Sequence, residues 1–363
     1  METLARLTLI VNITIFFFGQ LLRVNLFGIS FPIIDLSLIA LSVANLYLFL
    51  KTPSKLHKEG LLFFILNILF LLFNYKTINL SSLSYFLRLS SLLSLLIFPS
   101  NLFKSSLNIK FFNIVILANT IFSLIQYFFW PNFTYFSSQN WDPHLYRLVG
   151  TFFDPTFTAL IFLLFIINIY FNYKNNLLKN FLLTLSYFAL SLTYSRSTLI
   201  AFTVSFIYIF LTKKEYKKIF FIILLVTSTI FLLPRKDGEG TKLERTSSIK
   251  AKIENYKNAF SLYQKSPLLG IGYNNISQFR LDKNPQSHSN SAFDSSLINI
   301  LITTGPLGLY LFLKLFKNQS NKKNLFVNSL YLSVFVHSLF ANSLLYPWTL
   351  FYLIFLIRSR KLS

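Results

Sequence analysis

The chain has 363 residues, of which 54% are hydrophobic, 18% are aromatic and only 13% are charged. Soluble domains carry roughly 25% charged residues, so this composition, with apolar runs of about 20 residues, excludes a soluble protein and predicts a polytopic membrane protein. The net charge of +22 does not indicate a nucleic-acid partner, because the Lys and Arg residues are scattered over many short loops, and the absence of cysteine excludes disulfides and Cys-ligated metals.

Twelve apolar segments are predicted to be membrane helices, because backbone groups in lipid must find hydrogen-bond partners within their own segment. They are Leu7–Leu22, Ser30–Leu50, Leu61–Asn74, Leu80–Phe98, Phe111–Trp130, Thr156–Phe171, Leu177–Leu192, Thr198–Leu211, Ile219–Leu233, Ala292–Leu313, Leu325–Phe340 and Ser343–Ile357. The first segment lacks a small-residue cleavage site, so it is interpreted as a retained anchor. The predicted fold is an all-α polytopic bundle in which residues 1–363 form a single integral membrane domain.

The positions of Lys and Arg predict the orientation of this bundle. With the N-terminus in the cytoplasm, the inside segments carry nineteen Lys and Arg residues and the short outside segments carry four. This asymmetry predicts that both termini are cytoplasmic. Residues 234–291 then form a long outside loop between the ninth and tenth helices, and its ten basic residues count little because long loops translocate largely regardless of charge.

The loop at residues 234–291 is the one long polar segment in the chain. Five of its apolar or aromatic residues recur at helical spacing: Ile249, Ile253, Tyr256, Phe260 and Tyr263. This pattern predicts an amphipathic helix that lies along the membrane surface or packs on the bundle, and that Pro267 stops.

Arginines that remain on the outside, where topology depletes them, are the first candidates for function. They are Arg147, Arg196, Arg245 and Arg280. A guanidinium binds phosphate oxygens in a bidentate manner and stays charged, so several in one outer cavity would suit a lipid-linked diphosphate. The alternative is that each extends to lipid head groups. Arg88 lies in the middle of a predicted helix, where a charge is either functional or paired with another helix, for example with Asp35.

Histidines and acids on the outside are the next candidates. A neutral His288, at the mouth of the tenth helix, could accept a proton from a sugar hydroxyl. His144, Asp154, Asn290 and Asp294 are secondary candidates. Asp294 either orients His288 or, as the residues favour, caps the following helix, and His337 is interpreted as a hydrogen-bonding residue between helices. No nucleotide motif, metal site or cofactor site is indicated.

Several motifs in this order resemble one family of proteins. They are Arg147-Leu-Val-Gly-Thr-Phe-Phe-Asp154-Pro155, Leu192-Thr-Tyr-Ser-Arg196-Ser, Arg245 with Ser266-Pro-Leu-Leu-Gly-Ile-Gly272, and His288-Ser-Asn290 followed by Gly305-Pro-Leu-Gly308. Together they are similar to the O-antigen polymerase and O-antigen ligase superfamily of bacterial inner-membrane glycosyltransferases. The resemblance runs from about Tyr146 to Leu311, and it implies a GT-C-like helix bundle.

The resemblance also implies a reaction and roles for individual residues. It implies that a protein embedded in the lipid bilayer transfers a glycan from undecaprenyl diphosphate, on the periplasmic face and without a metal. Arg147, Arg196 and Arg245, with Arg280 and Arg88 as further candidates, would bind the diphosphate. His288 would activate the acceptor hydroxyl, so that His288, Arg196 and Arg147 form the catalytic set. Asp154 in place of Asn, and the serine between His288 and Asn290, depart from the family pattern and indicate a divergent acceptor.

Three functions remain open on this sequence. The first is a polymerase that joins lipid-linked repeat units, favoured because the chain is short and its outer loop is modest; a chain-length regulator is then a further candidate partner. The second is a ligase that transfers the glycan to lipid A–core or to another acceptor. The third is a transporter or flippase of lipid-linked sugars, which should place more polar residues inside its helices than this chain does.

Overall fold

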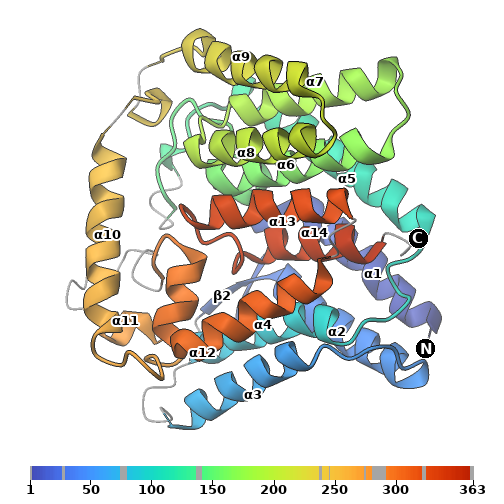
Figure 1. Cartoon of the computed structure of the whole chain (residues 1–363), viewed down its shortest axis with the longest axis vertical. Helices are drawn as coiled ribbons and strands as arrows, with labels where there is room; N and C mark the ends of the chain where they lie inside the picture. The colour runs from blue at the N-terminus through green and yellow to red at the C-terminus, as the bar shows by residue number, and fades with distance from the viewer. Residues whose placement is uncertain are drawn as a thin grey trace.

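The computed structural model describes residues 2–26, 29–73, 80–135, 141–236, 239–244, 246–273, 275–279, 292–320 and 324–359. Most of these residues are helical (Figure 1). The longer helices are α1 (Glu2–Phe18), α2 (Ile33–Lys51), α3 (Lys58–Phe73), α4 (Leu80–Ile97), α5 (Ser106–Phe129), α6 (Pro155–Asn172), α7 (Leu177–Ser191), α8 (Arg196–Thr212), α9 (Tyr216–Leu232), α10 (Ser247–Tyr263), α12 (Ser296–Gln319), α13 (Leu325–Ser338) and α14 (Pro347–Ser359). The short elements are η1 (Gly19–Leu21), β1 (Arg23–Leu26), β2 (Ile29–Pro32), η4 (Gly150–Phe152), η5 (Glu239–Thr241) and α11 (Ile276–Phe279).

Each of the twelve predicted apolar segments coincides with one of these helices, which confirms the all-α membrane fold. Among the described residues, five helical segments are long and apolar enough to cross a membrane: 2–21, 33–51, 106–129, 155–172 and 296–319. Five further apolar helices are shorter. The count of twelve crossings therefore stays a prediction.

A small antiparallel hairpin between α1 and α2 is not predicted from the sequence. Strand β1 pairs with β2 so that Arg23 lies opposite Pro32 and Asn25 lies opposite Ser30. The prediction that a helix begins at Ser30 is wrong, because residues 29–32 are extended and α2 begins at Ile33. The hairpin places polar groups of β1 and β2 inside one end of the bundle, where they line a cavity.

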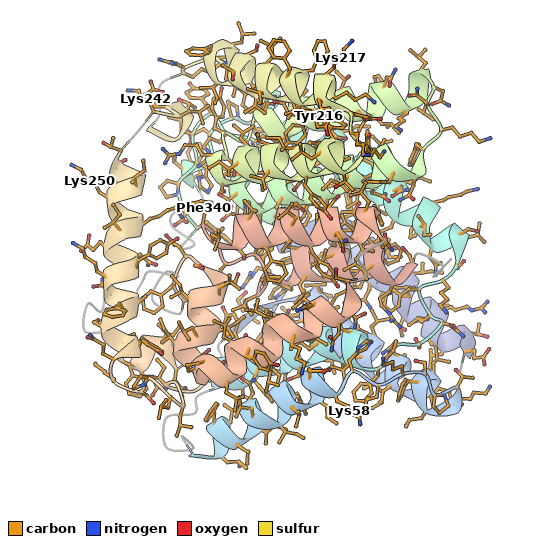
Figure 2. The ribbon with its side chains drawn as sticks, in the orientation of Figure 1. Lys58, Tyr216, Lys217, Lys242, Lys250 and Phe340 are labelled. Carbon is orange, nitrogen blue, oxygen red and sulfur yellow. The ribbon has the colours of Figure 1, made fainter. Side chains whose placement is uncertain are left out.

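The helices of the bundle run side by side, and α10 crosses one end of them (Figure 1). The two termini lie at the opposite end. In Figure 2, Lys242 and Lys250 lie at the α10 end, whereas Lys58 and Lys217 lie at the far ends of α3 and α9. Helix α6 is buried over most of its length, as expected for a central helix. This arrangement places the described residues between 234 and 279 together at one end, and they are called the outer segment below.

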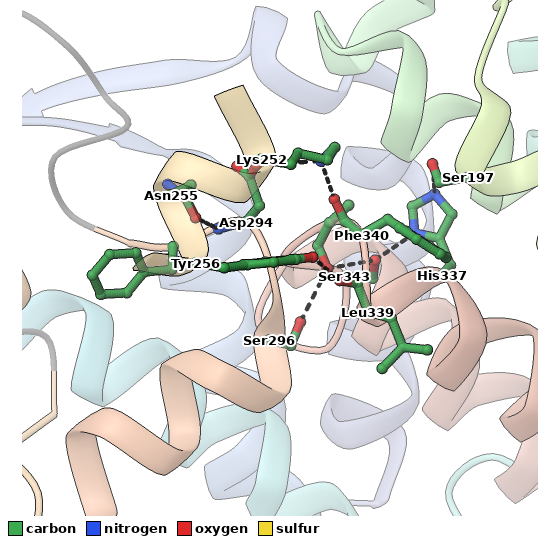
Figure 3. A network of polar contacts seen from close by, with 12 residues as sticks. Ser197, Lys252, Asn255, Tyr256, Asp294, Ser296, His337, Leu339, Phe340 and Ser343 are labelled. Atoms are coloured by element: carbon green, nitrogen blue, oxygen red, sulfur yellow. Dashed lines mark hydrogen bonds and ion pairs between the residues drawn. The ribbon is translucent and has the colours of Figure 1, made fainter. Parts of the chain in front are cut away.

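Helix α10 forms within the predicted amphipathic stretch, and of the five residues that predicted it Tyr256 and Tyr263 lie on the docked side. Ile249, Ile253 and Phe260 are exposed, whereas Ala259 and Leu262 are buried in a small cluster with Phe293. Tyr256 donates to the carbonyl of Leu339 beyond the end of α13 (Figure 3). The carbonyls at the end of a helix lack partners within it, so polar side chains of α10 satisfy them better than apolar ones would.

Helix α12 is broken at Gly305, whose φ of 66° and ψ of −176° are not helical. Pro306 has no N–H, so the carbonyl of Ile302 has no partner within the helix. The turn after α10 supplies one: Ile271 donates its N–H to the carbonyl of Ile302 (2.9 Å), and Gly272 donates to that of Thr303 (3.0 Å). The Pro-Leu-Leu-Gly-Ile-Gly turn therefore fastens the outer segment to the bundle.

Candidate functional site

Arg147 lies at the α10 end of the bundle, with only 8% of its surface exposed. Its Nε donates to the carbonyl of Thr193 at 2.9 Å, and the N–H of Leu148 donates to the carbonyl of Leu192 at the same distance. A Cβ added at Gly240 would lie 2.6 Å from Arg147 Cδ, so the backbone of η5 lies directly against the arginine. The residues before η4 thus join the α7–α8 turn to the outer segment.

Arg196 is the first residue of α8, directly after that turn. The turn is tight because Tyr194 takes a left-handed conformation with φ 54°, and its hydroxyl donates to the carbonyl of Pro234 at 2.7 Å. Arg196 Nη1 donates to the carbonyl of Leu243 at 3.2 Å. The structure therefore brings Arg147 and Arg196 to one turn and to one stretch of the outer segment, although 48 residues separate them in sequence.

A polar network begins at Ser197, the residue after Arg196, and runs into the bundle (Figure 3). Ser197 contacts His337 Nε2 at 3.2 Å, and His337 Nδ1 contacts Ser343 at 2.5 Å. His337 is fully buried and joins α13 to α8, which confirms its interpretation as a hydrogen-bonding residue between helices.

The sequence favours Asp294 as the cap of α12, but this prediction is wrong. Ser295 is the N-cap residue, and its hydroxyl accepts from the N–H of Ile298 at 3.5 Å. Asp294 instead forms an ion pair with Lys252 of α10 (3.2 Å), and its N–H donates to Asn255 (3.0 Å). The contacts of Asp294 with Lys252 and Asn255 therefore hold α10 against the bundle.

Asp154 caps α6, and its side chain accepts from the N–H groups of Thr156 (2.6 Å) and Phe157 (3.2 Å). Burial raises the pKa of Asp154, against these two donors and the charge of Arg147, which lower it. Because the folded state then binds a proton more readily than the unfolded state, stability falls as pH rises from the ordinary Asp value through the raised pKa.

We expect Asp154→Asn to raise the melting temperature above this pH window and to flatten its pH profile. Asn keeps an acceptor oxygen for the cap and removes the buried charge. Melting of the detergent-solubilised protein between about pH 4 and about pH 7 tests this. Asp142→Asn, at an exposed Asp, is the control. Identical slopes for Asp154→Asn and the parent chain would contradict the expectation.

A cavity of about 330 Å³ lies beside these residues. Asp154 lines it, and so does Asn342, the neighbour of Ser343 in the polar network. Arg88 also lines it and forms a two-point ion pair with Asp35, in which Nε lies 2.7 Å from Oδ1. Of the two alternatives for Arg88, the structure shows the pair with another helix, and Asp35 neutralises its charge.

The remaining predicted residues are placed as follows. His144 lies in the segment after α5, where its carbonyl accepts from the N–H of Phe133 at 2.8 Å. Arg245, Arg280, His288 and Asn290 lie outside the described residues.

Sequence reasoning missed the walls of the cavity. Arg23 lines it, together with nine aromatic side chains that include Trp141, Tyr346 and Trp348. Arg23 carried the same signal as Arg147 and Arg196, since it is a basic residue retained on the predicted outside. The aromatic residues gave no such signal, because 18% of the whole chain is aromatic.

Comparison with a family model covers part of this region. A family model described as O-Antigen ligase matches residues 181–313, which include Arg196, α10 and the break in α12. No curated protein matches the chain. Residues 181–313 are thus similar to the O-antigen ligase family, which supports the resemblance to the O-antigen polymerase and ligase superfamily.

Proposed function

We propose that the protein polymerises oligosaccharide repeat units carried on undecaprenyl diphosphate, at the periplasmic face of a bacterial inner membrane. The observation that carries the proposal is the convergence of Arg147 and Arg196 on one turn. Two guanidinium groups fixed by carbonyl partners are suited to a diphosphate, because their charge is in place before the substrate arrives. The modest outer segment, with α10 as its one long helix among the described residues, favours a polymerase.

The proposed reaction is a substitution at the anomeric carbon of the donor sugar. The hydroxyl oxygen of the acceptor forms a bond to this carbon, and the bond from the carbon to the diphosphate oxygen breaks. The electron pair leaves with the diphosphate, whose charge Arg147 and Arg196 stabilise. The hydroxyl proton passes to a base, for which the sequence offers His288. Neither a metal nor a nucleotide is required by this chemistry, since the diphosphate is already a good leaving group.

A ligase is the second candidate, because the family model that matches residues 181–313 carries that description. The ligase would use the same donor and the same arginines. It would differ only in its acceptor, which is lipid A–core or another outer molecule instead of a second lipid-linked repeat unit.

Deletion of the gene, followed by analysis of surface glycan and of undecaprenyl-linked glycan, separates these functions. We expect surface glycans cut to a single repeat, as a polymerase requires. Long polymer left on the carrier, above a bare acceptor, would instead show a ligase. Unchanged surface glycan and unchanged carrier glycan would overturn both and leave the transporter. Restoration with the parent gene controls for effects of the deletion itself.

A further inference from the structure

The cavity beside the arginines has the walls of a sugar-binding site. Nine aromatic side chains line its volume of about 330 Å³, among them Trp141 from the segment after α5 and Trp348 from α14. Aromatic faces with a few polar groups are typical of small-molecule sites, because the rings pack against apolar C–H faces while the polar groups fix orientation. A pyranose ring has both kinds of surface.

Two polar atoms on this wall have no hydrogen-bond partner among the described residues. They are the side-chain oxygen of Asn342 and the indole N–H of Trp348, whose side chain is only 1% exposed. Buried polar groups are nearly always hydrogen-bonded, so these two atoms are exceptions within the wall, although each has almost no accessible surface and neither faces the open cavity.

Arg23 gives the cavity a positive charge that forms no ion pair with an acid among the described residues. Its guanidinium donates to Gln20 Oε1 (2.6 Å), to Ser30 Oγ (2.8 Å) and to the carbonyl of Ser30 (2.6 Å), which are all neutral. Arginine has five N–H groups, and three hydrogen bonds are described for Arg23. The guanidinium also lies 5.4 Å from the ring centre of Trp141. The β1–β2 hairpin thus holds a charged donor beside an aromatic wall.

The other charges at the cavity are matched elsewhere or lie at its edge. Arg88 is paired with Asp35, and the charge of Asp154 interacts with Arg147. Asp142 is exposed. Burial, and then repulsion from Arg88, lower the pKa of Arg23, so the guanidinium lies in a positive environment that an anion would relieve.

We propose that this cavity is a glycan subsite that binds a sugar bearing an anionic group, with Arg23 as the partner of that group. The inference rests on the proposed function, since it assigns an acidic sugar to the repeat unit that the protein transfers. The cavity adjoins the arginine site: Asp154 lines it and interacts with Arg147, and Asn342 lines it next to the network of Ser343, His337 and Ser197. A sugar in the cavity therefore lies close to the proposed diphosphate position.

Tryptophan fluorescence can report binding directly, because two of the three tryptophans line the cavity and Trp130 is 62% exposed outside it. In a Trp130→Phe background, the emission comes from Trp141 and Trp348. The purified full-length protein is titrated with methyl glucuronide, with methyl glucoside and with inorganic diphosphate. We expect the glucuronide to bind at least about tenfold more tightly than the glucoside, as a charge-assisted hydrogen bond predicts.

Variants decide which group causes this preference. Arg23→Gln should remove the preference for glucuronide and leave glucoside binding unchanged, whereas Arg23→Lys should keep part of it and shows that the hairpin still folds. Arg196→Ala should keep the preference while transfer is lost, so a failure of the proposed transfer reaction is read separately from a failure of this inference. Equal binding of the two sugars, or a preference that survives Arg23→Gln, would overturn the inference. The remaining contrary result is that inorganic diphosphate displaces the glucuronide from the parent protein and not from Arg23→Gln. That result would overturn the inference, because Arg23 would then bind the diphosphate of the carrier and not an acidic sugar.

Discussion

Arg196→Ala is expected to lower glycan transfer by about 10²–10³-fold, the loss seen when one fixed donor to a developing negative charge is removed. The side chain is held at the first turn of α8 by the carbonyl of Leu243, so its charge is in position before the donor binds. Alanine leaves the diphosphate oxygens without this partner. Transfer is measured with purified protein and a lipid-linked oligosaccharide, and in cells as the length of surface glycan.

Two further variants separate charge from structure. Arg196→Lys keeps the charge but loses the planar fork, so we expect intermediate activity. Arg235→Ala is the matched control, because this arginine belongs to the same outer segment, is exposed, and pairs only with Glu244 among the contacts described for it. It should transfer at the parent rate. Full activity of Arg196→Ala, at equal protein levels, would remove Arg196 from the proposed site.

Gly305→Ala is expected to cause the largest loss of stability. The φ of 66° is in the region that favours glycine, and a Cβ at this position would lie 2.1 Å from the carbonyl oxygen of Leu268. Backbone strain of this kind costs about 1–3 kcal/mol, and the collision with another backbone adds to it. That sum is a large part of the roughly 5–15 kcal/mol that stabilises a typical protein.

The expected result is a sharp fall in the yield of monodisperse protein and in its melting temperature in detergent. Leu307→Ala, two residues later in the same helix, is the control, because Leu307 is 55% exposed and its removal should change stability by no more than about 0.5 kcal/mol. A Gly305→Ala protein with the melting temperature of the parent would show that the turn at Leu268 can move away from the break in α12.

The sequence predicted the helices well, because each apolar run is long and must satisfy its own backbone in lipid. It predicted the approach of Arg147 to Arg196 only through their motifs, since residues far apart in sequence meet through tertiary contacts. Its prediction of α10 rested on five residues that the structure divides: Tyr256 and Tyr263 lie on the docked side, whereas Ile249, Ile253 and Phe260 are exposed. Periodicity cannot make this division, because the carbonyls beyond α13 that accept from Tyr256 and Lys252 come from another part of the chain. It also missed the cavity, whose wall residues come from many elements and share no spacing.

The break in α12 also affects the surrounding lipid. Only residues 306–319 continue as a straight helix, which spans about 21 Å at 1.5 Å per residue, and its neighbour α3 spans about 24 Å. The two pack together through Phe63 and Phe312, whose ring centres are 5.4 Å apart. A hydrocarbon core is about 30 Å thick, so the straight part of α12 is too short to cross it alone, and residues 296–304 before the break are needed to complete the crossing. The surrounding lipid therefore meets two helical pieces joined at Gly305 in place of one straight helix.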